Sequence, residues 1–138
     1  MDKVVNELSK KIIIYQRNLI TDNRGWFLKV VNGNEINLPR KELEIYFVNA
    51  KEGQIRGGHY HIEANEWFTL IKGKAILILQ DICSYEILKL ELNSDNPQTI
   101  YVPNNVAHKF VNVGDDSFIL CAYTDKLYDS LDTIEYDF

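Results

Sequence analysis

His59, His61 and His108 are the only histidines in this sequence of 138 residues, and a single residue separates the first two. In a β-strand, residues two apart project from the same face, so His59 and His61 are expected to point toward one site. Strands carrying Glu66 and His108 could face them. This set could bind a divalent metal such as Zn, Fe, Mn or Ni. Without a metal, the imidazoles could act as general acid and base near neutral pH.

Nine short runs rich in β-branched and aromatic residues predict the strands that would hold these side chains. Clusters of Gly, Asn, Asp and Pro separate them and favour tight turns. Regularly spaced short strands close into a barrel or a two-sheet jelly roll, so we predict an all-β fold. Histidines that merely fill its core are a weaker interpretation, because no histidine is used elsewhere. The predicted strands are 11–17, 26–31, 44–50, 66–73, 74–80, 85–92, 98–103, 108–113 and 118–124.

Little else in the chain predicts regular structure. The one expected helix spans residues 4–11, and the acidic tail, residues 125–138, is expected to form a short helical turn or an arm. A chain of this length can bury one core of useful size, so we expect one domain over residues 1–138. Cys83 and Cys121 lack the CxxC spacing of a zinc or redox pair and are expected to be small buried side chains.

Two motifs extend the prediction to a superfamily. The segment GQIRGGHYHIEANEWFTLIKG resembles the first cupin motif, G(X)5HXH(X)3-4E(X)6G, and every fixed position is filled. Those positions are Gly53, His59, His61, Glu66 and Gly73. The segment PNNVAHKFVN, from Pro103, resembles the second motif, PXG(X)2H(X)3N. His108 and Asn112 are in place, and Asn105 stands where Gly is usual; Asn tolerates the same left-handed turn. The resemblance implies a single-domain cupin, a jelly-roll β-barrel.

The surroundings of the motifs resemble two related groups of sugar-nucleotide enzymes. The segment RGGHYH is similar to segments of the dTDP-4-keto-6-deoxyglucose 3,4-ketoisomerases and of the 3,5-epimerases. TDNRGWF resembles an epimerase element, whereas IYVPNNVAHKF and the tail LYDSLDTIEYD resemble the ketoisomerases (WxcM-like cupins). The short length also favours the ketoisomerases, because epimerases usually carry an extra C-terminal segment.

This resemblance implies a sugar-nucleotide 3,4-ketoisomerase in the biosynthesis of unusual deoxy or amino sugars for surface polysaccharide. Such an enzyme would take the proton from C3 of a dTDP-4-keto-6-deoxyhexose, form an enediol(ate), and return a proton to C4. By position, His59 matches the acid–base histidine of both groups, and His61 would be its partner or proton carrier. The alternatives are a 3- or 3,5-epimerase, a metal-binding cupin of other activity such as an oxygenase, and a cupin that only binds its ligand.

Further residues are candidates for contact with substrate. Arg56 matches the RG arginine of the resembling enzymes, and a guanidinium suits a diphosphate. Arg24 could add a second contact from this or a neighbouring subunit, or could form a surface ion pair with Asp22. The remaining candidates are Tyr46 and Tyr101, which could exchange a proton with the sugar, and Trp67, His108 and Glu66 in the binding site.

The glutamate at position 66 bears on whether the protein needs a metal cofactor. The resembling ketoisomerases carry a different residue there and work without metal, so no cofactor is required on that resemblance. The cupin domain of capsular-polysaccharide reductases, which this chain also resembles, keeps the glutamate and binds zinc. A metal held by His59, His61, Glu66 and His108 would stabilise the enediolate as a Lewis acid and remove the histidines from acid–base service.

The charge and hydropathy of the sequence limit the partners that we expect. The 15 basic and 20 acidic residues give a net charge of -5, scattered without long runs, which argues against nucleic acid and membrane surfaces. The sequence contains neither a signal-peptide pattern nor a stretch approaching the roughly 20 apolar residues of a membrane span. We therefore expect a cytoplasmic protein. The resembling enzymes form homodimers by exchanging N-terminal strands, and the run KIIIYQ would suit such an edge.

Overall fold

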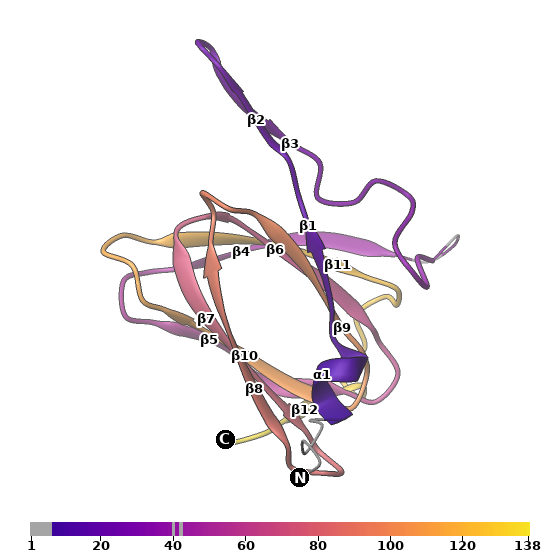
Figure 1. Cartoon of the computed structure of the whole chain (residues 1–138). Helices are drawn as coiled ribbons and strands as arrows, with labels where there is room; N and C mark the ends of the chain where they lie inside the picture. The colour runs from indigo at the N-terminus through magenta and orange to yellow at the C-terminus, as the bar shows by residue number, and fades with distance from the viewer. Residues whose placement is uncertain (1–6, 40, 42) are drawn as a thin grey trace, which may run out of the picture.

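The computed structural model describes residues 7–39, 41 and 43–138, and within them it is built almost entirely of antiparallel strands. Figure 1 shows them wrapped into a barrel with one short helix at its side. The elements are α1 (Glu7–Lys11), β1 (Ile13–Gln16), β2 (Leu19–Asp22), β3 (Gly25–Leu28), β4 (Glu44–Ala50), β5 (Ile55–His61), β6 (Glu66–Lys72), β7 (Lys74–Asp81), β8 (Ile87–Asn93), β9 (Gln98–Val102), β10 (Val106–Asn112), β11 (Phe118–Thr124) and β12 (Thr133–Glu135). The predicted all-β jelly roll is confirmed.

Two five-stranded sheets form the barrel. One has the order β1-β9-β6-β11-β4 and the other the order β12-β5-β10-β7-β8. Every strand pair is antiparallel, and β4 of the first sheet and β5 of the second lie close along one side of the barrel. The hairpin β2–β3 forms a separate two-stranded unit that projects away from the barrel (Figure 1).

The inner faces of both sheets form one hydrophobic core. In β7, alternate residues Ala75, Leu77 and Leu79 are buried, as expected of a strand with one face toward the core. Burying one leucine side chain contributes about 1.5–3 kcal/mol, so this alternation stabilises the register of the sheet. The core continues through Phe68, Leu70, Ile100, Val102, Phe110, Phe118 and Leu120.

Strand β6 is buried on both faces, because the loop that follows β3 covers the outer face of its sheet. Arg17 forms an ion pair with Glu35 of this loop and donates a hydrogen bond to the Thr99 hydroxyl at 2.8 Å. The Thr99 hydroxyl in turn donates to the Val30 carbonyl at 2.8 Å. Because the sheet lies between its two faces, side chains on this outer face do not reach the barrel interior.

The ends of the chain depart in part from the sequence prediction. The predicted helix over residues 4–11 is α1 where the structure describes it, and its first three residues lie outside the described part. The tail forms strand β12 rather than a helical turn, because it pairs with β5 through Thr133, Ile134 and Glu135. Cys83 is exposed, whereas Cys121 is buried as expected. No helix in the described ranges is long and apolar enough to cross a membrane.

Candidate active site

The three histidines converge inside the barrel. His59 and His61 lie on β5, and His108 lies opposite His59 on the neighbouring strand β10. The centroid of the His59 ring is 5.3 Å from the centroid of the His61 ring and 4.9 Å from that of the His108 ring. One nitrogen from each ring lies within 4.8 Å of the others, which is close enough for a shared metal or proton network.

Two glycines allow β5 to approach β10 closely. Gly57 and Gly58 have φ angles of +95° and +87°, which disfavour side chains, and the pairing is irregular between His108 and Lys109. A Cβ on Gly57 would lie 2.7 Å from the His108 carbonyl oxygen and 3.1 Å from the Lys109 Cα, whereas one on Gly58 would meet nothing closer than 4.0 Å.

Gly57→Ala should therefore destabilise the protein more than Gly58→Ala. Both variants carry the positive-φ strain of about 1–2 kcal/mol, and only Gly57→Ala adds a clash with backbone, which costs about 1–3 kcal/mol more. Urea unfolding of the two variants measures this difference. Equal losses of unfolding free energy would show that the approach of β5 to His108 places no constraint on position 57.

Glu66 lies at the centre of the site and is almost fully buried. One of its carboxylate oxygens, Oε1, is 2.6 Å from His61 Nε2 and 3.5 Å from His108 Nε2. The other oxygen, Oε2, accepts a hydrogen bond of 2.6 Å from the Tyr46 hydroxyl. Burial alone would raise the pKa of Glu66, but the contacts with His61, His108 and Tyr46 outweigh it and hold the pKa below its ordinary value.

The neighbours of Glu66 titrate differently from one another. Burial lowers the pKa of His59, and it lowers the pKa of fully buried His108 to about 4, so both rings are neutral at pH 7. Burial also acts against the charged form of His61, but Glu66 and Asp132 outweigh it and raise the pKa of His61. Burial and the negative charge of Glu66 raise the pKa of Tyr46, so its phenol stays protonated.

Two buried atoms in this cluster lack a well-directed hydrogen bond. His61 Nε2 and Glu66 Oε1 approach each other closely, yet neither has a partner of acceptable geometry among the described residues. His108 Nε2 lies 3.5 Å from the same Glu66 oxygen. Two imidazoles and one carboxylate are a donor set that divalent zinc or iron accepts, so the residues fit a metal.

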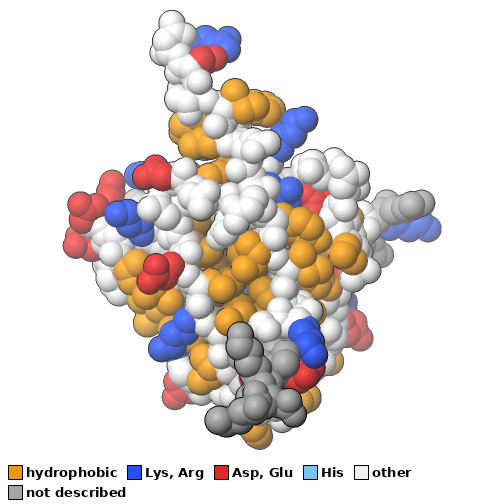
Figure 2. Space-filling model, viewed as in Figure 1, with side chains coloured by type: hydrophobic (Ala, Val, Ile, Leu, Met, Phe, Trp, Pro, Cys, Tyr) orange, Lys and Arg blue, Asp and Glu red, His pale blue; other side chains and the backbone are white. Residues whose placement is uncertain are grey.

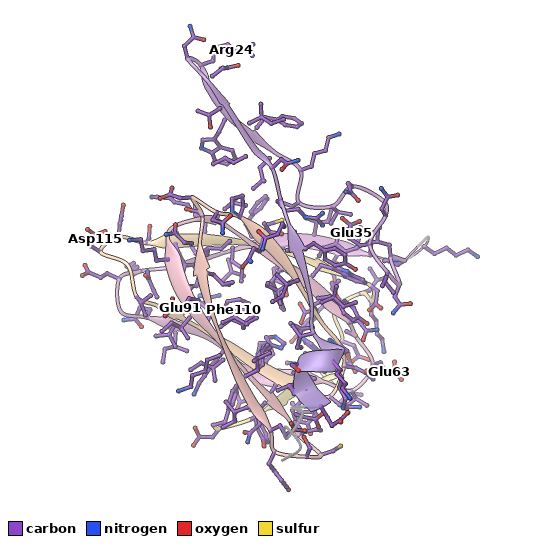
Figure 3. The ribbon with its side chains drawn as sticks, in the orientation of Figure 1. Arg24, Glu35, Glu63, Glu91, Phe110 and Asp115 are labelled. Atoms are coloured by element: carbon purple, nitrogen blue, oxygen red, sulfur yellow. The ribbon has the colours of Figure 1, made fainter. Side chains whose placement is uncertain are left out.

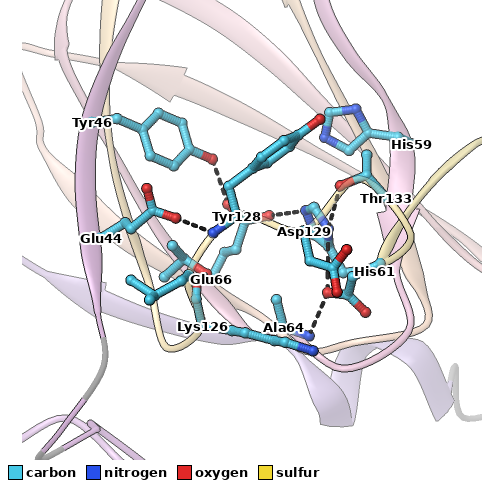
Figure 4. Close-up of a pocket in the computed structure, with 13 residues that line it drawn as sticks. Glu44, Tyr46, His59, His61, Ala64, Glu66, Lys126, Tyr128, Asp129 and Thr133 are labelled. Atoms are coloured by element: carbon cyan, nitrogen blue, oxygen red, sulfur yellow. Dashed lines mark hydrogen bonds and ion pairs between the residues drawn. The ribbon is translucent and has the colours of Figure 1, made fainter.

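A pocket of about 380 Å³ opens onto this cluster (Figure 4). Tyr46 on β4 and His59 on β5 border it from the two opposing sheets. A second cavity of about 160 Å³ also borders Tyr46 and His59 and is lined by Arg56. The two cavities thus meet at the pair formed by Tyr46 and His59, with Arg56 at the end away from His61.

Two residues predicted for the site do not reach it. Trp67 alternates with Glu66 along β6, so its side chain lies on the outer face of the sheet. Tyr101 is paired with Trp67 across β9 and β6, and their rings pack at 5.1 Å on that outer face. Both residues therefore lie on the other side of the sheet from the histidines and do not line the pocket. Tyr60, which alternates with His59 and His61 along β5, points away from the site and packs on Tyr136.

Arg24 lies far from the histidines of its own chain. It sits at the tip of the β2–β3 hairpin (Figure 3) and forms a 2.6 Å ion pair with Asp22, both largely exposed. The surface ion pair predicted as the alternative is therefore present.

Sequence reasoning missed the residues that the tail contributes. Lys126, Tyr128, Asp132 and Thr133 line the pocket, together with Glu44 from β4. Thr133 Oγ1 lies 3.4 Å from His61 Nδ1, and Asp132 Oδ2 lies 3.9 Å from the same nitrogen. The pairing of β12 with β5 and the hydrogen bonds that join the tail to Glu44 and, through Asp132, to Glu63 bring the tail residues to the site. The alternation Thr133-Ile134-Glu135 is too short to have predicted the pairing.

The polysaccharide biosynthesis C-terminal domain family has a sequence model that matches residues 20–136. This chain belongs to that family. Among proteins of known function, this chain resembles the UDP-2-acetamido-2,6-beta-L-arabino-hexul-4-ose reductase of Pseudomonas aeruginosa, with 24% identity over 115 residues. The match covers 83% of this chain but 29% of the reductase, so the chain spans less than a third of that relative's length.

Several solved structures share the fold of this chain. A dTDP sugar isomerase from Desulfovibrio desulfuricans G20 superposes with a TM-score of 0.82 at 17% identity, covering 90% of this chain and 82% of the isomerase. The dTDP-6-deoxy-D-glucose-3,5-epimerase RmlC from Legionella pneumophila Philadelphia 1 gives a TM-score of 0.78 at 15% identity, covering 91% and 72%. At these identities the likeness establishes the cupin jelly roll.

Proposed function

We propose that this protein catalyses proton transfer at the carbon next to the ketone of a nucleotide-linked 4-keto-6-deoxyhexose, and that it inverts C3. The observation that carries the proposal is the placement of His59 and Tyr46 in one pocket on opposing sheets. An epimerase needs a base on one face of the sugar ring and a proton donor on the other, and this pair supplies both.

The protonation states of the pair suit these roles. His59 is neutral at pH 7 and makes no side-chain hydrogen bond to residues 7–39, 41 or 43–138, so a ring nitrogen is free to take the C3 proton. The C–H bond breaks, and its electrons form the enediolate with the C4 oxygen. Tyr46, whose hydroxyl donates to Glu66 in the free protein, then gives its phenolic proton to C3 from the opposite face, which restores the ketone. Solvent exchange resets both side chains.

A divalent metal fits the histidine cluster. His59, His61 and His108 would hold it, because one nitrogen of each ring lies within 4.8 Å of the others, and Glu66 Oε1 lies beside two of these rings. A bound metal would supply Lewis-acid stabilisation of the enediolate oxygen. A metal on all three rings would occupy a nitrogen of His59, so the proton-transfer steps above belong to the metal-free protein.

The names of related proteins support the substrate class. The Pseudomonas reductase acts, by its name, on a UDP-linked hexul-4-ose, and the Legionella epimerase was solved with dTDP-4-keto-L-rhamnose. Both are nucleotide-linked 4-keto sugars. The family's connection with polysaccharide biosynthesis agrees with a role in making a precursor sugar.

The 3,4-ketoisomerase predicted from sequence is the second candidate, and one observation favours it. His59 and His61 project from the same face of β5 with ring centroids 5.3 Å apart. Two imidazoles on one side of the sugar could take a proton from C3 and deliver one to the neighbouring C4, which moves the ketone to C3.

Incubation with dTDP-4-keto-6-deoxyglucose, and separately with its UDP analogue, in heavy water tests the proposal. We expect deuterium at C3 with inverted configuration and a ketone still at C4. Deuterium at C4 with a ketone at C3 would establish the ketoisomerase instead, and no exchange at any carbon would refute both. We expect chelator-treated protein to exchange at the full rate, because no metal then competes for His59, and loss of exchange with chelator would shift the mechanism to metal.

We further propose a homodimer held by the β2–β3 hairpin. Ile20, Trp26 and Phe27 of this hairpin are 60%, 55% and 57% exposed, and Figure 2 shows apolar side chains along its base. The free edge strand β4 also presents exposed apolar side chains, Ile45 and Phe47. Packing these surfaces between two copies would remove both from water. The hairpin would then carry Arg24 toward the partner's site. Strand β1, which carries the run KIIIYQ, pairs with β9 of its own chain.

Sedimentation of the double variant Trp26→Ser/Phe27→Ser tests this assembly. The wild-type protein should sediment as a dimer, and the double variant should shift to monomer at the same concentration because its hairpin loses the apolar contacts. Val113→Ser, at a site 52% exposed on the barrel, is the control and should remain dimeric. A monomeric wild type, or a double variant that remains dimeric, would contradict the assembly.

A further inference from the structure

A strap formed by residues 125–132 crosses the mouth of the 380 Å³ pocket between β11 and β12. Carboxylates hold it at several points. Glu44 of β4 accepts a hydrogen bond from the Tyr128 backbone N–H. Asp132 accepts hydrogen bonds from the backbone N–H groups of Glu63 and Ala64, at 2.7 and 3.1 Å. The strap is thereby attached both to β4 and to the turn that follows His61.

The strap presents apolar side chains to solvent at the pocket mouth. Leu127, Tyr128 and Leu131 are 54%, 75% and 82% exposed. Leu127 and Tyr128 line the pocket, and Leu131 does not. In Figure 4 the Tyr128 ring extends over the pocket between Tyr46 and His59. An aromatic ring so exposed at a pocket that holds candidate acid–base groups has room to pack against a bound ligand.

The charges around the two cavities differ. The pocket under the strap is lined by the carboxylates of Glu44, Asp129 and Asp132. Lys126 is the one lysine or arginine among its described lining residues, and it is already paired with Glu63. Like charges repel, so this pocket disfavours a diphosphate, whereas its oxygens can accept hydrogen bonds from hydroxyl groups.

The smaller cavity has the opposite character. Arg56 lines it, and no carboxylate is among its described lining residues. It meets the pocket under the strap at Tyr46 and His59. A nucleotide sugar lying along both cavities would therefore meet a cation at one end and acceptor oxygens at the other, with the acid–base pair between them.

We propose that Tyr128 is a specificity-determining contact with a sugar ring that lies under the strap, with the diphosphate at the Arg56 end as the sequence resemblance implies. The substrate class rests on the proposed function. Tyr128 would cover the apolar face of the sugar ring, while the strap carboxylates accept from its hydroxyl groups.

Calorimetric titration with dTDP-glucose and with dTDP, and with their UDP analogues, tests this orientation. None of the four probes carries a keto sugar, so binding is measured even if no proton exchange occurs. Tyr128→Ala should weaken the nucleotide sugar about tenfold and leave the free nucleotide unchanged, because only the sugar touches the strap. Arg56→Ala should weaken both about tenfold. Tyr128→Phe, which keeps the ring, should bind both as the wild type does.

Leu131→Ala is the matched control, since it removes an exposed apolar side chain of the strap outside the pocket. It should leave both affinities unchanged. Equal weakening of sugar and free nucleotide by Tyr128→Ala, or no weakening of either, would overturn the proposal. So would failure of the wild type to bind any of the four probes. Failure of deuterium exchange alongside the expected binding pattern would reject the reaction and leave the orientation standing.

Discussion

Replacing His59 with asparagine should slow deuterium exchange at C3 by about 10²–10⁴-fold, the usual contribution of a positioned general base. Asparagine keeps a polar side chain of moderate size but cannot take a proton near neutral pH. The neutral His59 ring that faces the pocket is the group lost. Single-turnover exchange followed by NMR measures the effect without interference from product release.

The fold should tolerate this replacement. The His59 side chain is partly exposed and packs against His61 and His108 without a hydrogen bond to any residue that the structure describes. The melting temperature of His59→Asn should therefore stay close to that of the wild type. Exchange that persists at the wild-type rate in a folded His59→Asn protein would remove His59 from the mechanism and point to another base in the pocket.

Glu66→Gln should lower the free energy of unfolding by roughly 3 kcal/mol, because it removes one partner of a buried ionic cluster. Glutamine can still accept the hydrogen bond from Tyr46, so the loss is placed at the lower end of the range for such changes. It cannot balance the charge of His61, which lies 2.6 Å away. The same change removes the carboxylate beside the three histidines, so Zn²⁺ should raise the melting temperature of the wild type more than that of this variant.

The unfolding free energy that Glu66→Gln removes should depend on pH in chelator-treated protein. The pKa of Glu66 is lowered, so its contribution is present above the ordinary value of 4.5 and is lost as pH falls through the folded pKa. The pKa of His61 is raised, so its contribution is complete below 6.5 and is lost as pH rises through the folded pKa. The difference between wild type and Glu66→Gln should therefore be greatest at about pH 5.5.

Urea unfolding of both proteins across pH 3 to pH 9, at roughly one-unit intervals, measures this profile. Glu63→Gln is a suitable control because the Glu63 carboxylate is largely exposed and pairs only with Lys126 at the surface. A surface pair contributes about 0–1 kcal/mol. A difference between wild type and Glu66→Gln that stays flat with pH would show that Glu66 and His61 are not coupled as charges.

Local patterns in the sequence predicted most of the barrel and the location of the site. Alternation in runs such as residues 74–80 is a property of neighbouring residues, so it can be recognised without knowing the fold. The spacing of His59 and His61 places both rings on one face for the same reason. The alternation that aims Glu66 inward also turns Trp67 outward, so the misplacement of Trp67 could have been avoided by applying that rule.

Tertiary structure decided the rest, because it depends on pairings between distant segments. Tyr101 lies outside the barrel because its strand pairs with Trp67, and Tyr128, Asp132 and Thr133 reach the histidines because β12 pairs with β5. No local pattern specifies such registers. The residue types of His59, His61, His108 and Glu66 determined that a metal or acid–base site could exist. Their burial and distances decided which rings are neutral, and the packing of β4 near β5 decided that Tyr46 and His59 line one pocket.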